Sequence, residues 1–203
     1  MTSGEKRDGM PTWAKVLIAL VVVVVVGGIS LVVGGVFWMQ RTMKEAQDPA
    51  AIARVAQSIA VFQDPLPAGF KFTFGLDIAG IKTLTVEHQD DMQRLILMSF
   101  PKKEKTDPQE LVNALFEKGI NTPQANAKFE AVESKGVETV AGARMPYMIG
   151  SMTDKAGSKF EGFVACLVSQ SREETVFIYG IQPPGAAYNL AGTRLFLQSM
   201  KKI

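Results

Sequence analysis

The most prominent feature of the chain is one uninterrupted apolar run, residues 16–39 (VLIALVVVVVVGGISLVVGGVFWM). It contains no charged side chain, and its 24 residues would form a helix about 36 Å long. That length crosses a hydrocarbon core of roughly 30 Å with some tilt. Trp13 and Trp38 bracket the run, where aromatic side chains gather at the two membrane interfaces. The pattern predicts a transmembrane helix at 16–39, with Trp13 and Trp38 as interface anchors.

A buried core helix and a cleaved signal peptide are the alternatives to a membrane anchor. The apolar region of a signal peptide is about 7 to 15 residues long and precedes a small-residue cleavage site. Here the run is longer, and residues 39–42 (MQRT) offer no such site. Basic side chains flank both ends, so the positive-inside rule favours a cytoplasmic N-terminus only slightly. We expect an uncleaved single-pass signal anchor with the C-terminal domain outside the cytoplasm, periplasmic or extracellular.

The run also carries small residues at helical spacing. Gly27, Ser30 and Gly34 fall at i, i+3 and i+7, so they share one helix face. Small side chains let a second helix approach closely, which drives helix association in lipid. We expect this face to pack against another membrane helix, from a second copy or from a different protein. Glycine is also common in membrane helices without packing there, and that alternative stays open.

Beyond residue 39 the pattern is that of a folded domain. We divide the chain into an N-terminal tail (1–15), the transmembrane helix (16–39), a linker (40–48) and a domain (49–203). Asp48-Pro49 and Asp107-Pro108 each combine an N-cap with proline at the first helical position. Apolar periodicity predicts helices at 49–61, from 108 onward and at 186–201, and strands from 70 and at 81–87, 94–100, 127–134, 138–141, 144–152, 159–168 and 174–182.

The order of these elements predicts an α+β fold. Runs of strands joined by short turns form an antiparallel sheet, and helices between the runs flank it. Phe70, Phe72 and Phe74 alternate with polar residues, which predicts one buried face for the first long strand. Residues 75–80 (GLDIAG) are interpreted as the turn that follows, because they lack the glycine spacing of a nucleotide-binding loop.

Charge and composition narrow the function classes. The formal net charge of the 203 residues is +2, and the chain from residue 40 onward contains 19 basic and 18 acidic side chains. Such a balance lacks the basic patch that nucleic-acid binding requires, so we expect no nucleic-acid partner. A single cysteine excludes an internal disulfide, and a single histidine excludes any site that needs two.

Few side chains are candidates for chemistry. His88 lies beside Asp90 and Asp91 at a hairpin end, where the carboxylates could orient the ring or bind a cation, although polar residues are ordinary in turns. Asp77 with these two lacks the spacing of a calcium loop. Cys166 lies in an apolar strand and is expected to be a small buried hydrophobe. Methionine clusters can hold Cu(I), but strand alternation places Met145 on the face opposite Met148 and Met152.

The region from Ile59 to Phe100 resembles PsbP-like domains. The similarity lies in an extended LPAGF entry (Leu66 to Phe70), a strand, a glycine-containing turn and a hairpin, and later in a strand, Pro-Pro-Gly and a helix. The chain is also similar to uncharacterised bacterial envelope domains tethered by one N-terminal span. The resemblance implies a binding or accessory module of a membrane complex, and it carries over no functional residue.

We therefore expect a membrane-anchored, non-catalytic accessory module with no catalytic, cofactor or metal-binding residues. Its partners would be the lipid bilayer and another membrane protein, or a second copy through the span. The alternative is a membrane-tethered enzyme or small-ligand receptor that uses the face of the sheet. A deep pocket lined by ionisable groups of perturbed pKa would favour this alternative, and a flat apolar patch would favour the accessory module.

The small-residue face gives the first test. Gly34→Ile should weaken association within the membrane, because the larger side chain prevents close approach of a second helix. The measurement is co-purification or a membrane two-hybrid signal from the full chain, with Val24→Ile as a control for the apolar run. If Gly34→Ile associates as well as wild type does, the face is not an interface.

Overall fold

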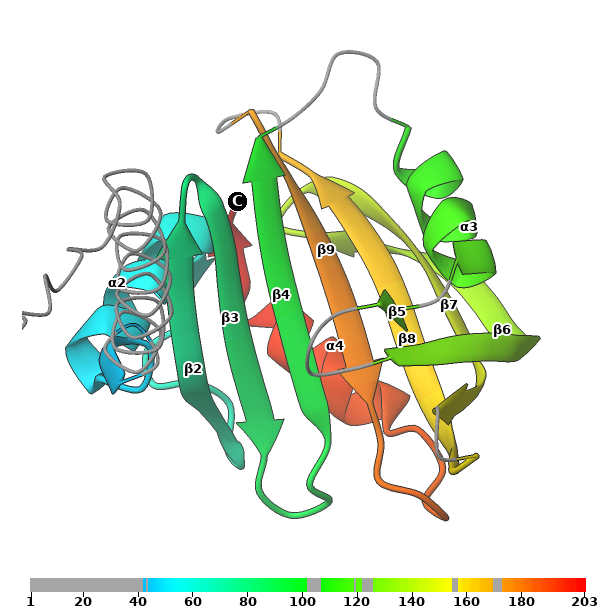
Figure 1. The fold of residues 1–203 in the computed structure, drawn as a ribbon. Helices are drawn as coiled ribbons and strands as arrows, with labels where there is room; N and C mark the ends of the chain where they lie inside the picture. The colour runs from blue at the N-terminus through cyan, green and yellow to red at the C-terminus, as the bar shows by residue number, and fades with distance from the viewer. Residues whose placement is uncertain are drawn as a thin grey trace, which may run out of the picture. The chain divides into compact units, whose positions relative to one another are not determined.

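The computed structural model describes residues 42, 44–101, 107–118, 120–121, 126–154, 157–169 and 173–203. Residues 46–203 form one compact unit. Its elements, in chain order, are α2 (Pro49–Ile59), β1 (Val61–Phe62), β2 (Phe70–Ile78), β3 (Ile81–His88), β4 (Arg94–Pro101), α3 (Pro108–Lys118), β5 (Ile120–Asn121), β6 (Asn126–Val140), β7 (Ala143–Asp154), β8 (Lys159–Val168), β9 (Glu174–Ile181), α4 (Leu190–Gln198) and β10 (Met200–Lys202) (Figure 1).

An eight-stranded sheet organises this unit. The strand order is β2-β3-β4-β9-β8-β7-β6-β5, and every neighbouring pair is antiparallel. The expected α+β class with an antiparallel sheet is therefore confirmed. The predicted transmembrane helix lies outside the described residues, and within the described part no helix is long and apolar enough to cross a membrane.

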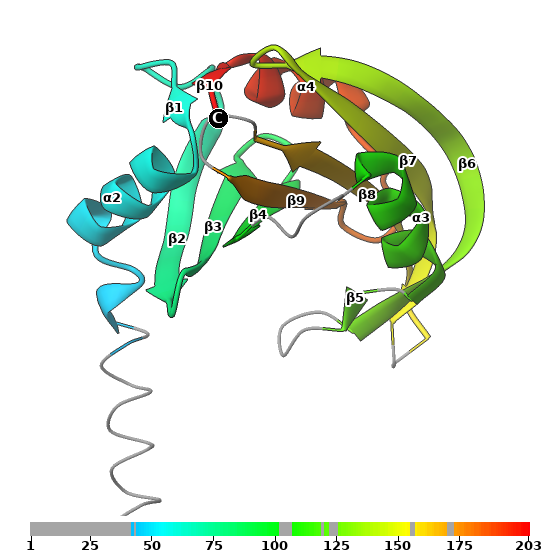
Figure 2. The same cartoon turned by 90° about the horizontal axis from the view of Figure 1, so that it is seen from above.

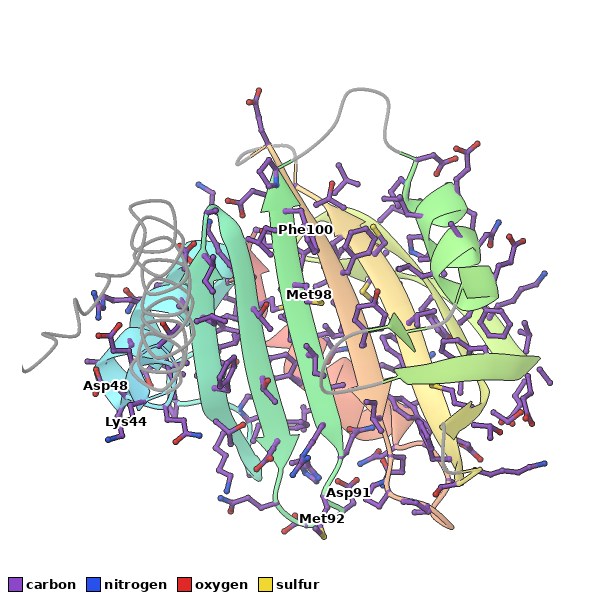
Figure 3. The ribbon with its side chains drawn as sticks, viewed as in Figure 1. Lys44, Asp48, Asp91, Met92, Met98 and Phe100 are labelled. Carbon is purple, nitrogen blue, oxygen red and sulfur yellow. The ribbon has the colours of Figure 1, made fainter. Side chains whose placement is uncertain are left out.

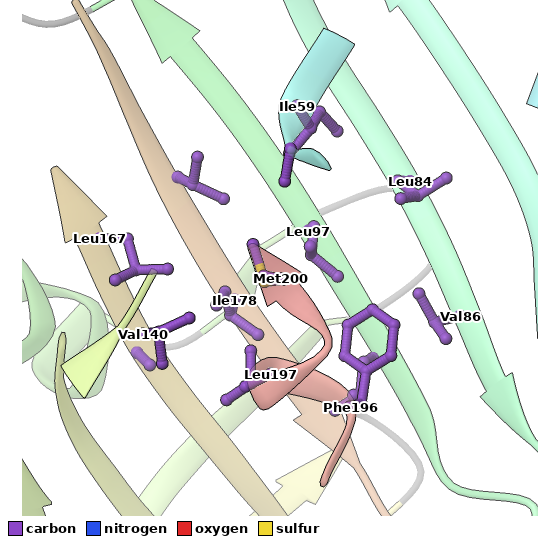
Figure 4. Packing of buried hydrophobic residues seen from close by; sticks show 14 of the residues in the cluster. Ile59, Leu84, Val86, Leu97, Val140, Leu167, Ile178, Phe196, Leu197 and Met200 are labelled. Carbon is purple, nitrogen blue, oxygen red and sulfur yellow. The ribbon is translucent and has the colours of Figure 1, made fainter. Parts of the chain in front are cut away.

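Helices lie on both faces of the sheet (Figure 2). On one face, α2, α4 and the two-stranded ribbon of β1 with β10 enclose the larger core, in which Ile59, Leu84, Leu97, Ile178 and Phe196 are almost inaccessible (Figure 4). On the other face, α3 packs over β7 and β8 and forms a smaller core. The sheet is thus the middle layer of three.

Local signals explain where the first helix begins and how it reaches the sheet. The Asp48 carboxylate accepts a hydrogen bond from the Ala51 amide (3.3 Å), as expected for an N-cap. The buried side chains Ile52, Val55 and Ile59 point toward the core. A Cβ on Gly75 would lie 2.8 Å from the Ile52 Cα, so glycine at this position allows α2 to pack directly on β2.

A bulge corrects the expected pattern of the first long strand. The register shifts between Phe72, which pairs with Val86, and Phe74, which pairs with Thr85. One extra residue on a strand reverses the faces of all later side chains. Phe74 therefore lies on the face opposite Phe70 and Phe72, and the prediction of one shared face was wrong for it.

The turn predicted over 75–80 is also shorter in the structure. Gly75 to Ile78 belong to β2, and only Ala79 and Gly80 form the turn. Both have positive φ values (52° and 81°), the signature of a two-residue type I′ hairpin turn. Ala141 and Gly142 form an equivalent turn between β6 and β7, with φ values of 48° and 79°.

Two further elements differ from expectation. The strands expected at 127–134 and 138–141 form one long strand, β6. Its pairing with β7 contains two register shifts. The strand curves from the α3 side of the sheet toward α4 (Figure 2). The helix expected at 186–201 covers only Leu190–Gln198, because Asn189 caps it and because residues 200–202 pair with β1 instead.

The two alanines in hairpin turns give a stability test. Ala79→Asn should raise the free energy of unfolding by about 0.5–1 kcal/mol, because asparagine tolerates the left-handed conformation better than alanine does. Ala141→Asn should gain less, because Ala141 also packs against the larger core. Denaturant unfolding of the full chain in mild detergent measures the change. Ala187→Asn is the matched control, since Ala187 is exposed and has no positive φ. Equal stability of all four proteins would contradict the prediction.

Candidate functional site

His88, the one histidine, lies at the end of β3 and contacts a carboxylate. Its Nδ1 lies 2.8 Å from Oδ1 of Asp91, and its ring packs against Phe70 with 4.5 Å between ring centroids. A Cβ on Gly69 would lie 2.7 Å from the imidazole Nε2, so the chain can pass this close only with glycine there. The expectation that neighbouring carboxylates orient the ring holds for Asp91.

Asp91 also connects the β3–β4 hairpin to a helix almost a hundred residues later. Its Oδ2 accepts a hydrogen bond from the Asn189 Nδ2 (2.6 Å), and its Oδ1 accepts one from the Gln93 amide (3.1 Å). The Gln93 Nε2 in turn donates to the Asn189 carbonyl (3.0 Å). Asn189 is the N-cap of α4 and accepts from the Gly192 amide (2.7 Å). The cluster therefore fixes the start of α4 against the hairpin.

These contacts determine the ionisation of Asp91. Partial burial of the carboxyl would raise its pKa, but hydrogen bonds from Asn189, Gln93 and His88 outweigh that effect and lower the pKa below its ordinary value. The carboxylate form is the one that the cluster stabilises.

The surroundings of His88 do not assemble a recognisable catalytic constellation. A histidine whose Nδ1 contacts a carboxylate can act as a general base. It then needs a nucleophile or a substrate within reach of its Nε2. The adjacent surface hollow of about 370 Å³ is lined by Lys71, Glu87, His88, Gln89, Met92 and Arg94, and none of these carries a hydroxyl or thiol. Within the described ranges, no three of the His, Cys, Asp and Glu side chains gather as metal ligands. The cluster is best explained as structural.

The other candidate residues lie in the two cores. Cys166 is fully buried, and burial, with a smaller effect of Asp107, raises the pKa of its thiol to about 12. It is a small hydrophobe, as expected. Met145 belongs to the larger core, whereas Met148 and Met152 belong to the smaller one. The expectation that strand alternation separates Met145 from the other two is confirmed.

The feature that sequence reasoning missed is an open apolar surface beside α3. Strand register places its side chains on one face of β2, β3, β4 and β9, the face that carries α3 farther along the sheet. None is fully buried. We call it the open face and define it by Phe74, Leu76, Ile78, Ile81, Ile96, Met98, Phe100 and Phe177.

The open face continues the smaller core. The fully buried members of that core, such as Val164 and Cys166, lie near α3. Ile96, Met98 and Phe177 pack against it but stay only half-buried. Phe100 extends the same surface, with its ring 5.6 Å from that of Phe177 in an edge-to-face arrangement. Figure 3 labels Met98 and Phe100 on β4. No described helix covers this part of the sheet.

A sequence signal for the open face did exist. The strand RLILMSF (94–100) is apolar at consecutive positions, so Leu95 and Leu97 face one side while Ile96 and Met98 face the other. Strands with two apolar faces are typical of sheets covered on both sides. In the described structure only one side of β4 is covered, so the second apolar row lacks a partner there.

Comparisons with protein-family models and with curated proteins give no match. The resemblance to PsbP-like domains therefore stays a prediction from pattern. The predicted helix-packing residues Gly27, Ser30 and Gly34 and the predicted interface anchors Trp13 and Trp38 lie outside the described residues.

The Asp91 cluster predicts a pH-dependent stability. Asp91→Asn should lower the free energy of unfolding at pH 7 by about 1–2 kcal/mol, because an amide offers one acceptor where the carboxylate offers two. A carboxyl whose pKa is lowered by folding stabilises the protein above its unfolded value, 3.8, and loses that contribution as the pH falls through the folded value.

The measurement is denaturant unfolding of the full chain at several pH values. The difference between wild type and Asp91→Asn should shrink below about pH 4. Asp77→Asn is the matched control, because Asp77 is an exposed carboxylate at the other end of the hairpin from the cluster. If the difference in the free energy of unfolding between wild type and Asp91→Asn does not change with pH, the carboxylate charge makes no contribution to stability.

Proposed function

We propose that this protein is a single-pass membrane-anchored binding module, a non-catalytic accessory subunit of a membrane or envelope complex. The apolar run 16–39 serves as its anchor, and the domain lies outside the cytoplasm. The partner docks on the part of the open face away from the β2–β3 turn, around Ile96, Met98, Phe100 and Phe177.

The observation that carries the proposal is the chemistry of the open face. Its eight members are all aliphatic, aromatic or methionine and come from four adjacent strands, and Thr83 and Thr85 of β3 lie on the same face between those of β2 and those of β4. Contiguous exposed apolar surface on a folded protein marks an interaction site. Aromatic residues and methionine are enriched, and charged residues depleted, at the centres of protein interfaces.

The supporting features point the same way. A flat row of cross-strand side chains suits a protein surface better than a small molecule, which needs a hollow that encloses it. The resemblance to PsbP-like domains also implies an accessory role. An enzyme or small-ligand receptor that used this face would need ionisable groups converging at its centre, where the polar neighbours are Thr83 and Thr85. The charged side chains of this face, Lys71, Glu87 and Arg94, lie at one end of it and pair with one another.

The test compares a half-buried apolar position on the open face with an exposed apolar position on α4, on the other side of the sheet. Met98→Glu places a charge at the centre of the open face, and Leu195→Glu places one on α4, where Leu195 is 50% exposed. The tagged full chain is purified from its native membranes in mild detergent, and the co-purifying proteins are quantified by mass spectrometry.

We expect one membrane protein to co-purify with wild type and with Leu195→Glu, and its recovery to fall at least tenfold with Met98→Glu. Circular dichroism of both variants verifies the fold. Equal recovery from all three proteins, or no specific partner of wild type, would contradict the proposal.

A further inference from the structure

The turn between β2 and β3 exposes apolar side chains at the edge of the molecule. Its four residues are Ile78, Ala79, Gly80 and Ile81, and none has a polar side chain. Ile78 is 41% exposed and Ile81 is 43% exposed. Polar residues and glycine normally dominate such turns, because the chain there faces water.

A second turn of the same type shows what apolar residues in a turn require. Val140, Ala141, Gly142 and Ala143 connect β6 to β7 with nearly the same backbone angles. Val140 is only 3% exposed and belongs to the larger core, and both alanines pack against that core. Packing explains the composition of this second turn. The β2–β3 turn has no corresponding packing among the described residues, since neither isoleucine belongs to a core cluster.

The β2–β3 turn is separated from the predicted anchor by only a short length of chain. The Ala46 carbonyl accepts a hydrogen bond from the Gly75 amide on β2 (2.9 Å). Ile78 follows Gly75 by three residues, about 10 Å along the strand. The apolar run ends at Met39, and the seven steps from there to Ala46 span at most about 25 Å. The turn is therefore within reach of the surface of the bilayer that would hold the anchor.

We propose that the β2–β3 turn inserts Ile78 and Ile81 into the interfacial region of a lipid bilayer. This inference rests on the proposed membrane anchor. The neighbouring charges lie away from the isoleucines, because Asp77 and Lys82 are cross-strand register partners on the other face of the hairpin. The Lys82 ammonium is held by Glu174 (2.5 Å) and by the Ser58 carbonyl (3.3 Å). A second contact point beside the anchor fixes how the domain sits on the membrane.

A fluorescent label read against lipid quenchers tests the contact. Ile81→Cys is labelled with the environment-sensitive dye NBD in the full chain, and the native Cys166 does not compete because it is buried. The protein is reconstituted in vesicles of phosphatidylcholine and phosphatidylglycerol, with and without lipids that carry a nitroxide near the headgroup. Leu195→Cys, exposed on α4, is the matched control, and Val24→Cys reports on the anchor.

We expect the nitroxide lipids to quench the label at position 81 at least twofold more than the label at position 195. Quenching at 24 but not at 81 would overturn the inference and leave the anchor standing. Absence of quenching at both 24 and 81 would overturn the anchor as well. A blue-shifted label at 81 that is not quenched, and whose shift depends on the protein-to-lipid ratio, would mean that a second copy covers the turn, which also overturns the inference.

Discussion

A β-sheet has two faces, and the structure depends on how differently they are covered. On one face, two helices and the β1–β10 ribbon exclude water from the larger core, where residues such as Leu84 and Phe196 are inaccessible. On the other face, one helix of 11 residues covers only the β7–β8 side. Since α3 is too short and too far along the sheet to cover β2 to β4, apolar side chains on those strands remain half-exposed. This unequal coverage separates a part of the domain that is closed to water from a part whose apolar side chains stay accessible.

The closed face is secured by polar contacts as well as by packing. Asp91, Gln93 and Asn189 form the hydrogen bonds that hold the first turn of α4 on the hairpin. The hydroxyl of Tyr188, just before the helix, also lies 2.8 Å from the hydroxyl of Thr193 within it. Each buried polar group that finds a partner avoids a desolvation cost of about 1–3 kcal/mol, so the cluster also specifies where the helix must start. It lies at the end of β3, whereas the centre of the open face lies along β4 and β9. The most polar cluster and the most apolar surface thus have separate roles.

Local signals predicted most of the elements, and non-local contacts account for the misses. Proline after Asp48 or Asp107 correctly marked two helix starts, because an N-cap acts within three residues. The bulge before Phe74 depends on the pairing of β2 with β3, and β10 exists because Val61 pairs with Lys202 across the whole domain. In the candidate site, His88 and Asp91 are neighbours in sequence and were singled out together. Asn189, almost a hundred residues away, could not be found from spacing. The only sequence signal of the open face was the strand 94–100, in which residues pointing to both faces are apolar.

Exposed apolar surface and unpaired strand edges both promote aggregation of a freely diffusing protein. At the edge of this sheet, several features oppose it. β2 is an edge strand, but its Gly75 amide is already bonded to Ala46, α2 packs over it, and the bulge near Thr73 interrupts its regular register. These features oppose edge-to-edge pairing with other chains. The face itself has no such protection, so its exposure is tolerable only where approach is restricted. The proposed membrane anchor would provide that restriction, because a tethered domain would meet its partner at a high effective concentration and in few orientations. With such an anchor, an interface of modest affinity would be sufficient, and the charged group of Lys71, Glu87 and Arg94 at one end of the face would add selectivity to the apolar contact.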